Sequence, residues 1–132
     1  MVLRNSFFAL SVLAACVGNA AGAGAKSGEQ VYQEVCAACH LAGVEKAPRF
    51  GDRKAWAALI KEGQVPLTVD GWIGVRGMPA RGGRNDLSLE EFARATAHMA
   101  RAAGANWQDP DTKTLERMRA LLKRREAQKA PR

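Results

Sequence analysis

The chain has 132 residues, three of them cysteine, and only 6% of its residues are aromatic. This length allows one small domain with appendages and a thin core, so we expect a metal, disulfide or cofactor to complete that core. The formal net charge is +7, but residues 1–112 hold 12 Lys/Arg and 11 Asp/Glu, whereas residues 113–132 hold 8 and 2. The basicity therefore belongs to the C-terminal segment, and nucleic acid is not an expected partner.

The first 25 residues have the order of a secretory signal peptide: Arg4, then an apolar run, then the small residues GNAAGAGA. The apolar run is shorter than the roughly 20 residues that span a bilayer. Cleavage among the small residues predicts an exported, periplasmic protein. Alternatively, the sequence ending at Cys16 resembles a bacterial lipobox, in which residues 1–15 are removed and lipidated Cys16 anchors the protein to a membrane.

Two segments after this signal have the caps of helices. Ser27 and Gln30 form a capping-box pattern, which predicts a first helix that the pair of cysteines closes. Asp52 as N-cap and Gly63 as stop predict a second helix, with Trp56 facing inward.

The strongest helix signals lie in the sequence DLSLEEFARATAHMARAAG. Ser88 and Glu91 form a second capping-box pattern, Leu87 and Phe92 have the spacing of a hydrophobic staple, and Gly104 provides a stop. No segment has the alternation of a strand, so we expect an all-α fold.

The basic tail, residues 113–132, has apolar residues at helical spacing, with Asp109 and Pro110 as cap and first turn. We expect an amphipathic helix of two or three turns. Its apolar stripe packs on the body with the cations in solvent, or the helix docks to an acidic protein partner or an anionic membrane surface.

Cys36-Ala37-Ala38-Cys39-His40 is the attachment signature of haem c. Two thiols three residues apart on one helical turn reach two vinyl groups on one haem edge, and the adjacent imidazole then lies under the iron. A thioredoxin-like redox pair or half a zinc site would need a βαβ pattern or a second Cys/His pair, which the sequence lacks. We therefore predict one covalently bound haem c, with His40 as an axial ligand.

The sixth iron ligand is predicted to be Met78, because it stands in RGMPARGG, a Gly/Pro-rich loop that lets backbone and thioether approach a flat cofactor. Met99 lies on a helix face where core packing is the ordinary role, and Met118 lies in the basic tail. His98 offers the alternative of two histidine ligands, although an exposed or packing imidazole is commoner at such a position.

With these residues the chain resembles class I c-type cytochromes, and within them the cytochrome c5 subgroup. The resemblance covers roughly residues 27–102 and rests on the ordered pieces GEQVYQEVCAACH, APRFGD, GMPARGG and DLSLEEF. It implies an all-α fold of three to four short helices around one covalently attached haem. Residues 26–104 would form this domain, and residues 105–132 a basic helical extension that the core family does not need.

The resemblance also implies roles by position. Cys36 and Cys39 would be the thioether sites, His40 the proximal and Met78 the distal ligand, while the carbonyl of Pro48 would bind the free ring nitrogen of His40. Trp56 would pack near the haem edge, with an ordinary core tryptophan as the alternative. Many members carry an extra cysteine pair where this chain has GGRN, so that disulfide is not expected here.

The function implied is that of an electron carrier rather than an enzyme, exchanging single electrons with other redox proteins through an exposed haem edge. One alternative is a haem peroxidase or gas sensor in which Met78 is labile. Another is an accessory haem subunit of a membrane-associated oxidoreductase.

Overall fold

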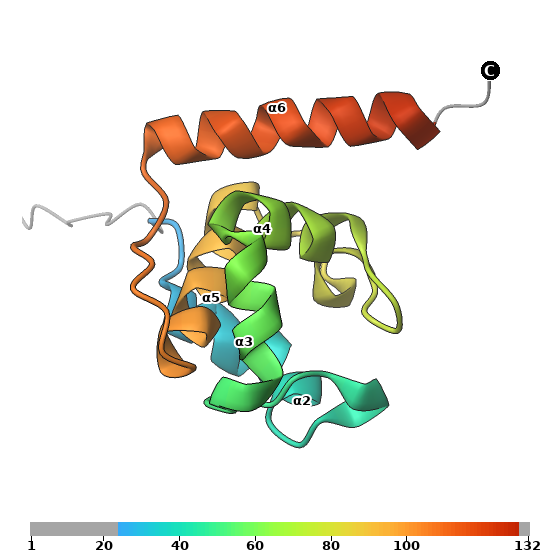
Figure 1. Cartoon of the computed structure of the whole chain (residues 1–132). Coiled ribbons are helices and arrows are strands. Elements are labelled where there is room, and N and C mark those ends of the chain that lie inside the picture. Colours follow the sequence, from blue (N-terminus) through green and yellow to red (C-terminus); the bar gives the residue numbers. More distant parts are fainter. Residues whose placement is uncertain (1–23, 130–132) are drawn as a thin grey trace, which may run out of the picture.

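The computed structural model describes residues 24–129, and within them the chain is helical, with a single isolated bridge between Val75 and Met78 as its only β-type pairing. The expected signal peptide and Cys16 lie outside the described residues. Figure 1 shows the helices wound into a small body, with the last helix lying across the top of it. The elements are α1 (Gly28–Val31), η1 (Tyr32–Cys36), α2 (Ala37–His40), η2 (Val44–Lys46), α3 (Arg53–Glu62), α4 (Gln64–Ile73), η3 (Ala80–Gly83), α5 (Leu89–Ala102) and α6 (Thr112–Lys129).

The first three elements follow one another without a break, so the predicted first helix is one helical run that ends at His40. Ser27 caps it: its hydroxyl accepts from the backbone N–H of Gln30, and the Gln30 side chain accepts from the backbone N–H of Ser27. The middle of the run, η1, is a π-helical turn that ends at Cys36. Such turns often mark functional sites, because they re-aim the side chains that follow them.

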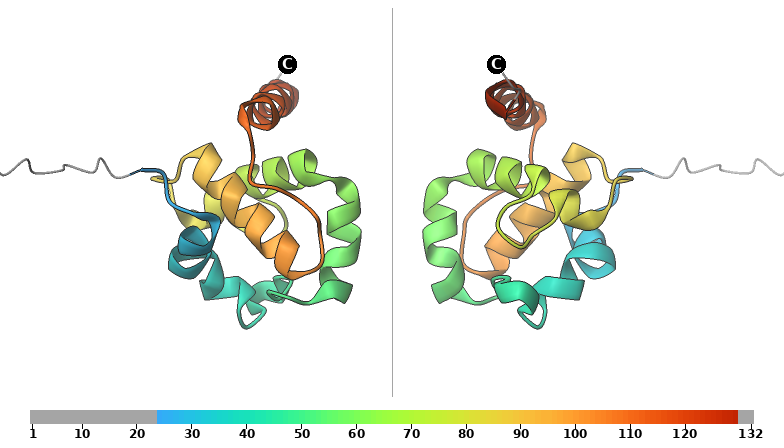
Figure 2. Two further views of the ribbon diagram at one scale, coloured as in Figure 1. Left: turned by 90° about the vertical axis from the view of Figure 1, so that its left-hand side faces the viewer. Right: turned by 90° about the vertical axis from the view of Figure 1, so that its right-hand side faces the viewer.

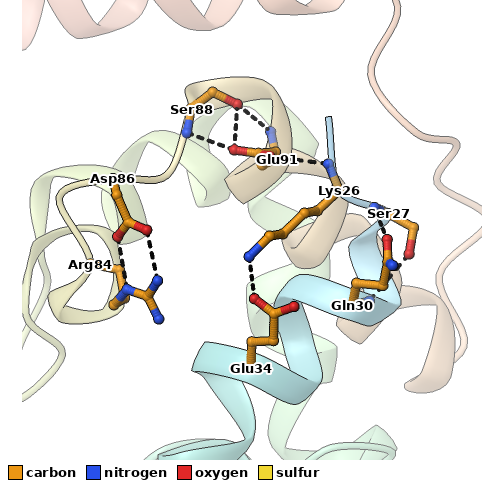
Figure 3. Close-up of polar contacts among 8 residues, drawn as sticks. All are labelled: Lys26, Ser27, Gln30, Glu34, Arg84, Asp86, Ser88 and Glu91. Carbon is orange, nitrogen blue, oxygen red and sulfur yellow. Dashed lines mark hydrogen bonds and ion pairs between the residues drawn. The ribbon is translucent and has the colours of Figure 1, made fainter. Parts of the chain in front are cut away.

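The start of this run crosses α5 at very close range. A Cβ on Gly28 would lie 2.3 Å from the carbonyl oxygen of Arg94, so only glycine permits this approach. Polar contacts hold the same corner: the backbone N–H of Lys26 donates to Glu91, and the Lys26 ammonium pairs with Glu34 (Figure 3). The two ends of the domain are thereby joined.

The predicted second helix is confirmed as α3, with the Asp52 carboxylate accepting from the N–H of Ala55 and Gly63 ending the helix at φ 95°. Trp56 is its buried residue. Helix α4 follows directly and was not expected, because Gly63 indicated only a stop. Pro66 lies in the first turn of α4, where its missing N–H has no intrahelical partner to lose.

Helix α5 agrees with its sequence signals. The Ser88–Glu91 capping box is present in full (Figure 3), and Leu87 and Phe92 are both buried in the same apolar cluster. The helix buries one long face, and Gly104 after it has φ 101°. This helix crosses the body between the first helical run and α4 (Figure 2).

The predicted tail helix is present, but its cap and length were wrong. Asp111, not Asp109, is the cap, since its carboxylate accepts from the N–H of Thr114 at 2.7 Å. The helix spans 18 residues, or about five turns, because no glycine or proline interrupts it before Pro131.

The apolar stripe of α6 packs on α4. Leu115, Met118 and Leu122 are buried in one cluster with Val65 and Val69 of α4. Figure 2 shows α6 end-on above the body, reached by a segment that runs along the outside of the other helices. Among the described helices, none combines the length and apolarity needed to cross a bilayer.

Candidate functional site

The body encloses a cavity of about 470 Å³ between the first helical run, α3, α4, α5 and the loop that follows α4. This size lies within the range of about 300–1,000 Å³ that is usual for cofactor and ligand pockets. The six residues that the sequence predicts for the site all line it: Cys36, Cys39, His40, Pro48, Trp56 and Met78.

The two cysteines lie on one helical turn at the cavity wall, and both are free thiols. Cys36 is buried, and this burial raises the pKa of its thiol to about 11. Cys39 is more accessible. The thiol of Cys36 is therefore kept neutral at physiological pH, which suits a group enclosed by apolar side chains.

His40 is 7% exposed and is held in a fixed orientation. Its Nδ1 lies 2.8 Å from the carbonyl oxygen of Pro48, the contact that the family resemblance implies. The backbone carbonyl of His40 accepts from the N–H of Phe50, which fixes the loop carrying Pro48. With Nδ1–H donating to a carbonyl, Nε2 keeps its lone pair and is free to bind a metal.

Trp56 is 3% exposed and also lines the cavity. Its indole N–H donates to the carbonyl of Arg49 at 2.9 Å, and its ring centroid lies 6.2 Å from that of His40. The side chain thus joins helix α3 to the loop that supports the imidazole.

Met78 lines the cavity from a different element, the tight loop after α4. Val75 and Met78 exchange two backbone hydrogen bonds of 3.1 and 2.9 Å, and Gly74 begins the turn at φ 94°. A Cβ on Gly71 of α4 would lie 3.0 Å from the ring of Phe92 and 3.6 Å from the methyl carbon of Met78. The missing side chain of Gly71 therefore leaves room for the Phe92 ring, and the methyl group of Met78 lies near the same glycine.

Two loops meet at the rim of the cavity. A Cβ on Gly77 would lie 3.5 Å from the Cβ of Glu45, which brings the loop after His40 against the loop that carries Met78. Glu45 and Arg76 both have positive φ, at 50° and 53°. Such conformations of non-glycine residues tend to cluster where ligands are held.

The other histidine and methionines are placed differently. His98 packs on the ring of Phe50 at a centroid distance of 5.3 Å, away from the cavity lining. Met118 is buried between α6 and α4. Met99 does line the cavity, at 4% exposure, from a helix face that the sequence indicated only as core.

The donor set fits a covalently bound haem. Two thiols, an oriented imidazole and a thioether surround an otherwise largely apolar space, as haem c with His and Met axial ligands requires. A zinc site is a poorer match, since residues 24–129 contain no group of three or more His, Cys, Asp or Glu side chains able to hold a metal ion.

Comparison with known proteins agrees with this chemistry. The family model described as cytochrome c oxidase, cbb3-type, subunit III matches residues 23–99. Cytochrome c-555 of Chlorobaculum tepidum is 38% identical over 86 residues, covering 62% of this chain and 80% of the relative. Cytochrome c5 of Azotobacter vinelandii is 37% identical over 81 residues, covering 60% of this chain and 98% of the relative.

A solved structure is similar in fold. It is a chain in the crystal structure of an electron transfer complex of nitrite reductase with cytochrome c, 37% identical to this chain with a TM-score of 0.56, and the match covers 58% of this chain and 93% of that one. These relatives favour an electron carrier over a haem peroxidase, a gas sensor or an accessory haem subunit. The chain therefore belongs to this family of class I c-type cytochromes, as a c5-like monohaem protein that binds haem c covalently and carries electrons between redox proteins.

Proposed function

We propose that Cys36 and Cys39 are the thioether sites of the haem and that His40 and Met78 are its axial ligands. The observation that carries this assignment is that the side chains of Cys36, Cys39, His40 and Met78 line one cavity, the first three from one helical run and Met78 from the loop after α4. Pro48 would orient the imidazole through its carbonyl, and Trp56 would close the side of the cavity next to His40.

The haem, when bound, supplies an iron that accepts and releases one electron. The protein contributes an environment that changes little between the two states: His40 is held by Pro48, and Met78 is held by its own turn. Two filled axial sites keep small molecules from the iron, and Met/His ligation raises the reduction potential relative to two histidines. Outer-sphere exchange with a docked partner then needs no bond rearrangement.

We further propose that residues 1–25 are an export signal, that residues 26–104 are the cytochrome domain and that residues 105–132 are a separate extension. The protein would act in the periplasm, either released or anchored through lipidated Cys16. The outer face of α6 carries exposed cations that suit an acidic protein partner or an anionic membrane surface, namely Lys113, Arg117, Arg119, Lys123 and Arg124. Binding to an acidic protein that weakens as salt is added, together with no binding to anionic vesicles, would assign the protein partner.

Visible spectra of the haem-loaded protein test the ligand assignment. We expect the wild type to show the weak ferric-iron-to-thioether band and to leave CO unbound in the ferrous state. Met78→Ala should lose the band and bind CO. Met99→Ala is the matched control, because Met99 also lines the cavity, and it should keep the band. Loss of the band in Met99→Ala with its retention in Met78→Ala would overturn the assignment.

A further inference from the structure

Three carboxylates line the cavity, those of Glu45, Glu62 and Asp70, and the electron-carrier assignment does not explain the position of Asp70. Asp70 is on α4, one residue before Gly71, and its side chain is 25% exposed. Its ion-pair partner is Arg125, which comes from α6 and is itself 34% exposed. A residue of the C-terminal helix thus reaches a group in the wall of the haem cavity.

In the sequence of α6, Arg125 stands in line with the apolar stripe. Leu115, Met118 and Leu122 form its buried stripe at spacings of three and four residues. Arg125 continues this spacing by three residues, so it lies where the next apolar side chain of the stripe belongs. A cation at this position is explained by the carboxylate of Asp70 facing it.

We propose that Arg125 tunes the reduction potential of the haem by compensating the charge of Asp70. This inference rests on the proposed function of the cavity. Oxidation of the iron adds one positive charge, and a negative charge in the cavity wall favours the oxidised form. Arg125 offsets this charge, so the paired state has a higher potential than the state with Asp70 alone.

A purely mechanical role makes a different prediction. If the ion pair only fastens α6 to α4, loss of either partner loosens α4 and, through Gly71, the Met78 loop. The two single variants would then change the protein in the same direction. If the pair acts by charge, the variants differ in sign: Arg125→Gln leaves a negative charge near the haem, and Asp70→Asn leaves a positive one.

The test is a potentiometric titration of the full-length, haem-loaded protein for Arg125→Gln, Asp70→Asn, the double variant and Arg125→Lys. We expect a lower midpoint for Arg125→Gln, a higher one for Asp70→Asn, and near-wild-type values for the double and the lysine variants. Lys123→Gln removes the same charge from an exposed site two residues earlier on α6, and it should shift the midpoint much less.

Shifts of the same sign in both single variants, or an Arg125→Gln shift no larger than that of Lys123→Gln, would overturn the proposal. Where Arg125→Gln unfolds below the working temperature, the Asp70→Asn shift decides: a rise supports the proposal, and a fall or no change contradicts it. The thioether band, recorded on the same samples, separates the question of Met78 ligation from the question of the role of Arg125. Its absence from the wild type would contradict Met78 ligation, whereas same-sign shifts with the band intact would contradict the role of Arg125 alone.

Discussion

Replacement of Gly28 by alanine tests the close crossing of the first helical run and α5. The added Cβ would lie 2.3 Å from the carbonyl oxygen of Arg94 and 2.7 Å from its carbon, whereas ordinary contact begins at 3.4 Å. The helices must therefore separate locally by about 1 Å. This separation loosens the packing of Val31 and Ala97, which are both fully buried.

Two effects of opposite sign determine how much Gly28→Ala changes the free energy of unfolding. Alanine gains at most about 1 kcal/mol over glycine in a helix interior, and less at the first helical position that Gly28 occupies. Overpacking of a well-packed site costs about 1–3 kcal/mol, and an overlap with backbone belongs at the upper end of this range. We expect a net loss of about 2 kcal/mol, which lowers Tm by about 8–16 °C in a domain of this size.

Thermal unfolding of the haem-loaded protein, followed by far-UV circular dichroism, measures this loss. Gly77→Ala is the matched control, because a Cβ at that position would meet its nearest neighbour, Glu45, at 3.5 Å, an ordinary contact distance, and its Tm should stay close to that of the wild type. A Gly28→Ala variant as stable as the wild type would refute the argument that glycine is required by the helix crossing.

Three further variants test other parts of the structure. Met118→Ala, at a fully buried site, should lower the free energy of unfolding by about 2–5 kcal/mol in chemical denaturation, and a loss below about 1 kcal/mol would contradict the packing of α6 on α4. The backbone N–H groups of Ser88 and Lys26 lower the pKa of Glu91 from 4.5, so the stability from this carboxylate is present above pH 4.5 and lost as the pH falls through the folded-state pKa. The Tm, measured by thermal unfolding at a series of pH values across this acid range, should therefore fall less steeply with decreasing pH for Glu91→Gln than for the wild type. Equal slopes of Tm against pH would show that Glu91 does not contribute. Cys39→Ser should retain haem through Cys36 alone, with one thioether detected by mass spectrometry after digestion, and two intact thioethers would exclude Cys39 as an attachment site.

Local signals were the most dependable part of the sequence. The capping boxes at Ser27 and Ser88 and the cap at Asp52 depend only on residues three positions apart, and the structure contains all three. Helix α4 was missed because Gly63 indicates the end of one helix but not that another begins at the next residue. The cap of α6 was placed at Asp109 rather than at Asp111, and its length was underestimated although no glycine or proline interrupts the segment before Pro131.

The segments that line the site are brought together by contacts that no local sequence pattern indicates. The attachment motif and the Met78 loop could each be identified alone, but the room that Gly71 leaves for the Phe92 ring and the contact of Glu45 with Gly77 could not. The pairing of Arg125 with Asp70 joins residues far apart in the chain. An arginine at the end of an apolar stripe indicates an acidic partner, but not its position.

A spectroelectrochemical titration of the wild-type, haem-loaded protein tests the central claim most directly. We expect one reversible step with a slope of about 59 mV per tenfold change in the ratio of oxidised to reduced protein, as a one-electron couple requires. The midpoint should be clearly positive, and the ferric thioether band should be recovered in full on reoxidation. A clearly negative midpoint, or a ferrous form that binds CO readily, would contradict a Met/His-ligated electron carrier.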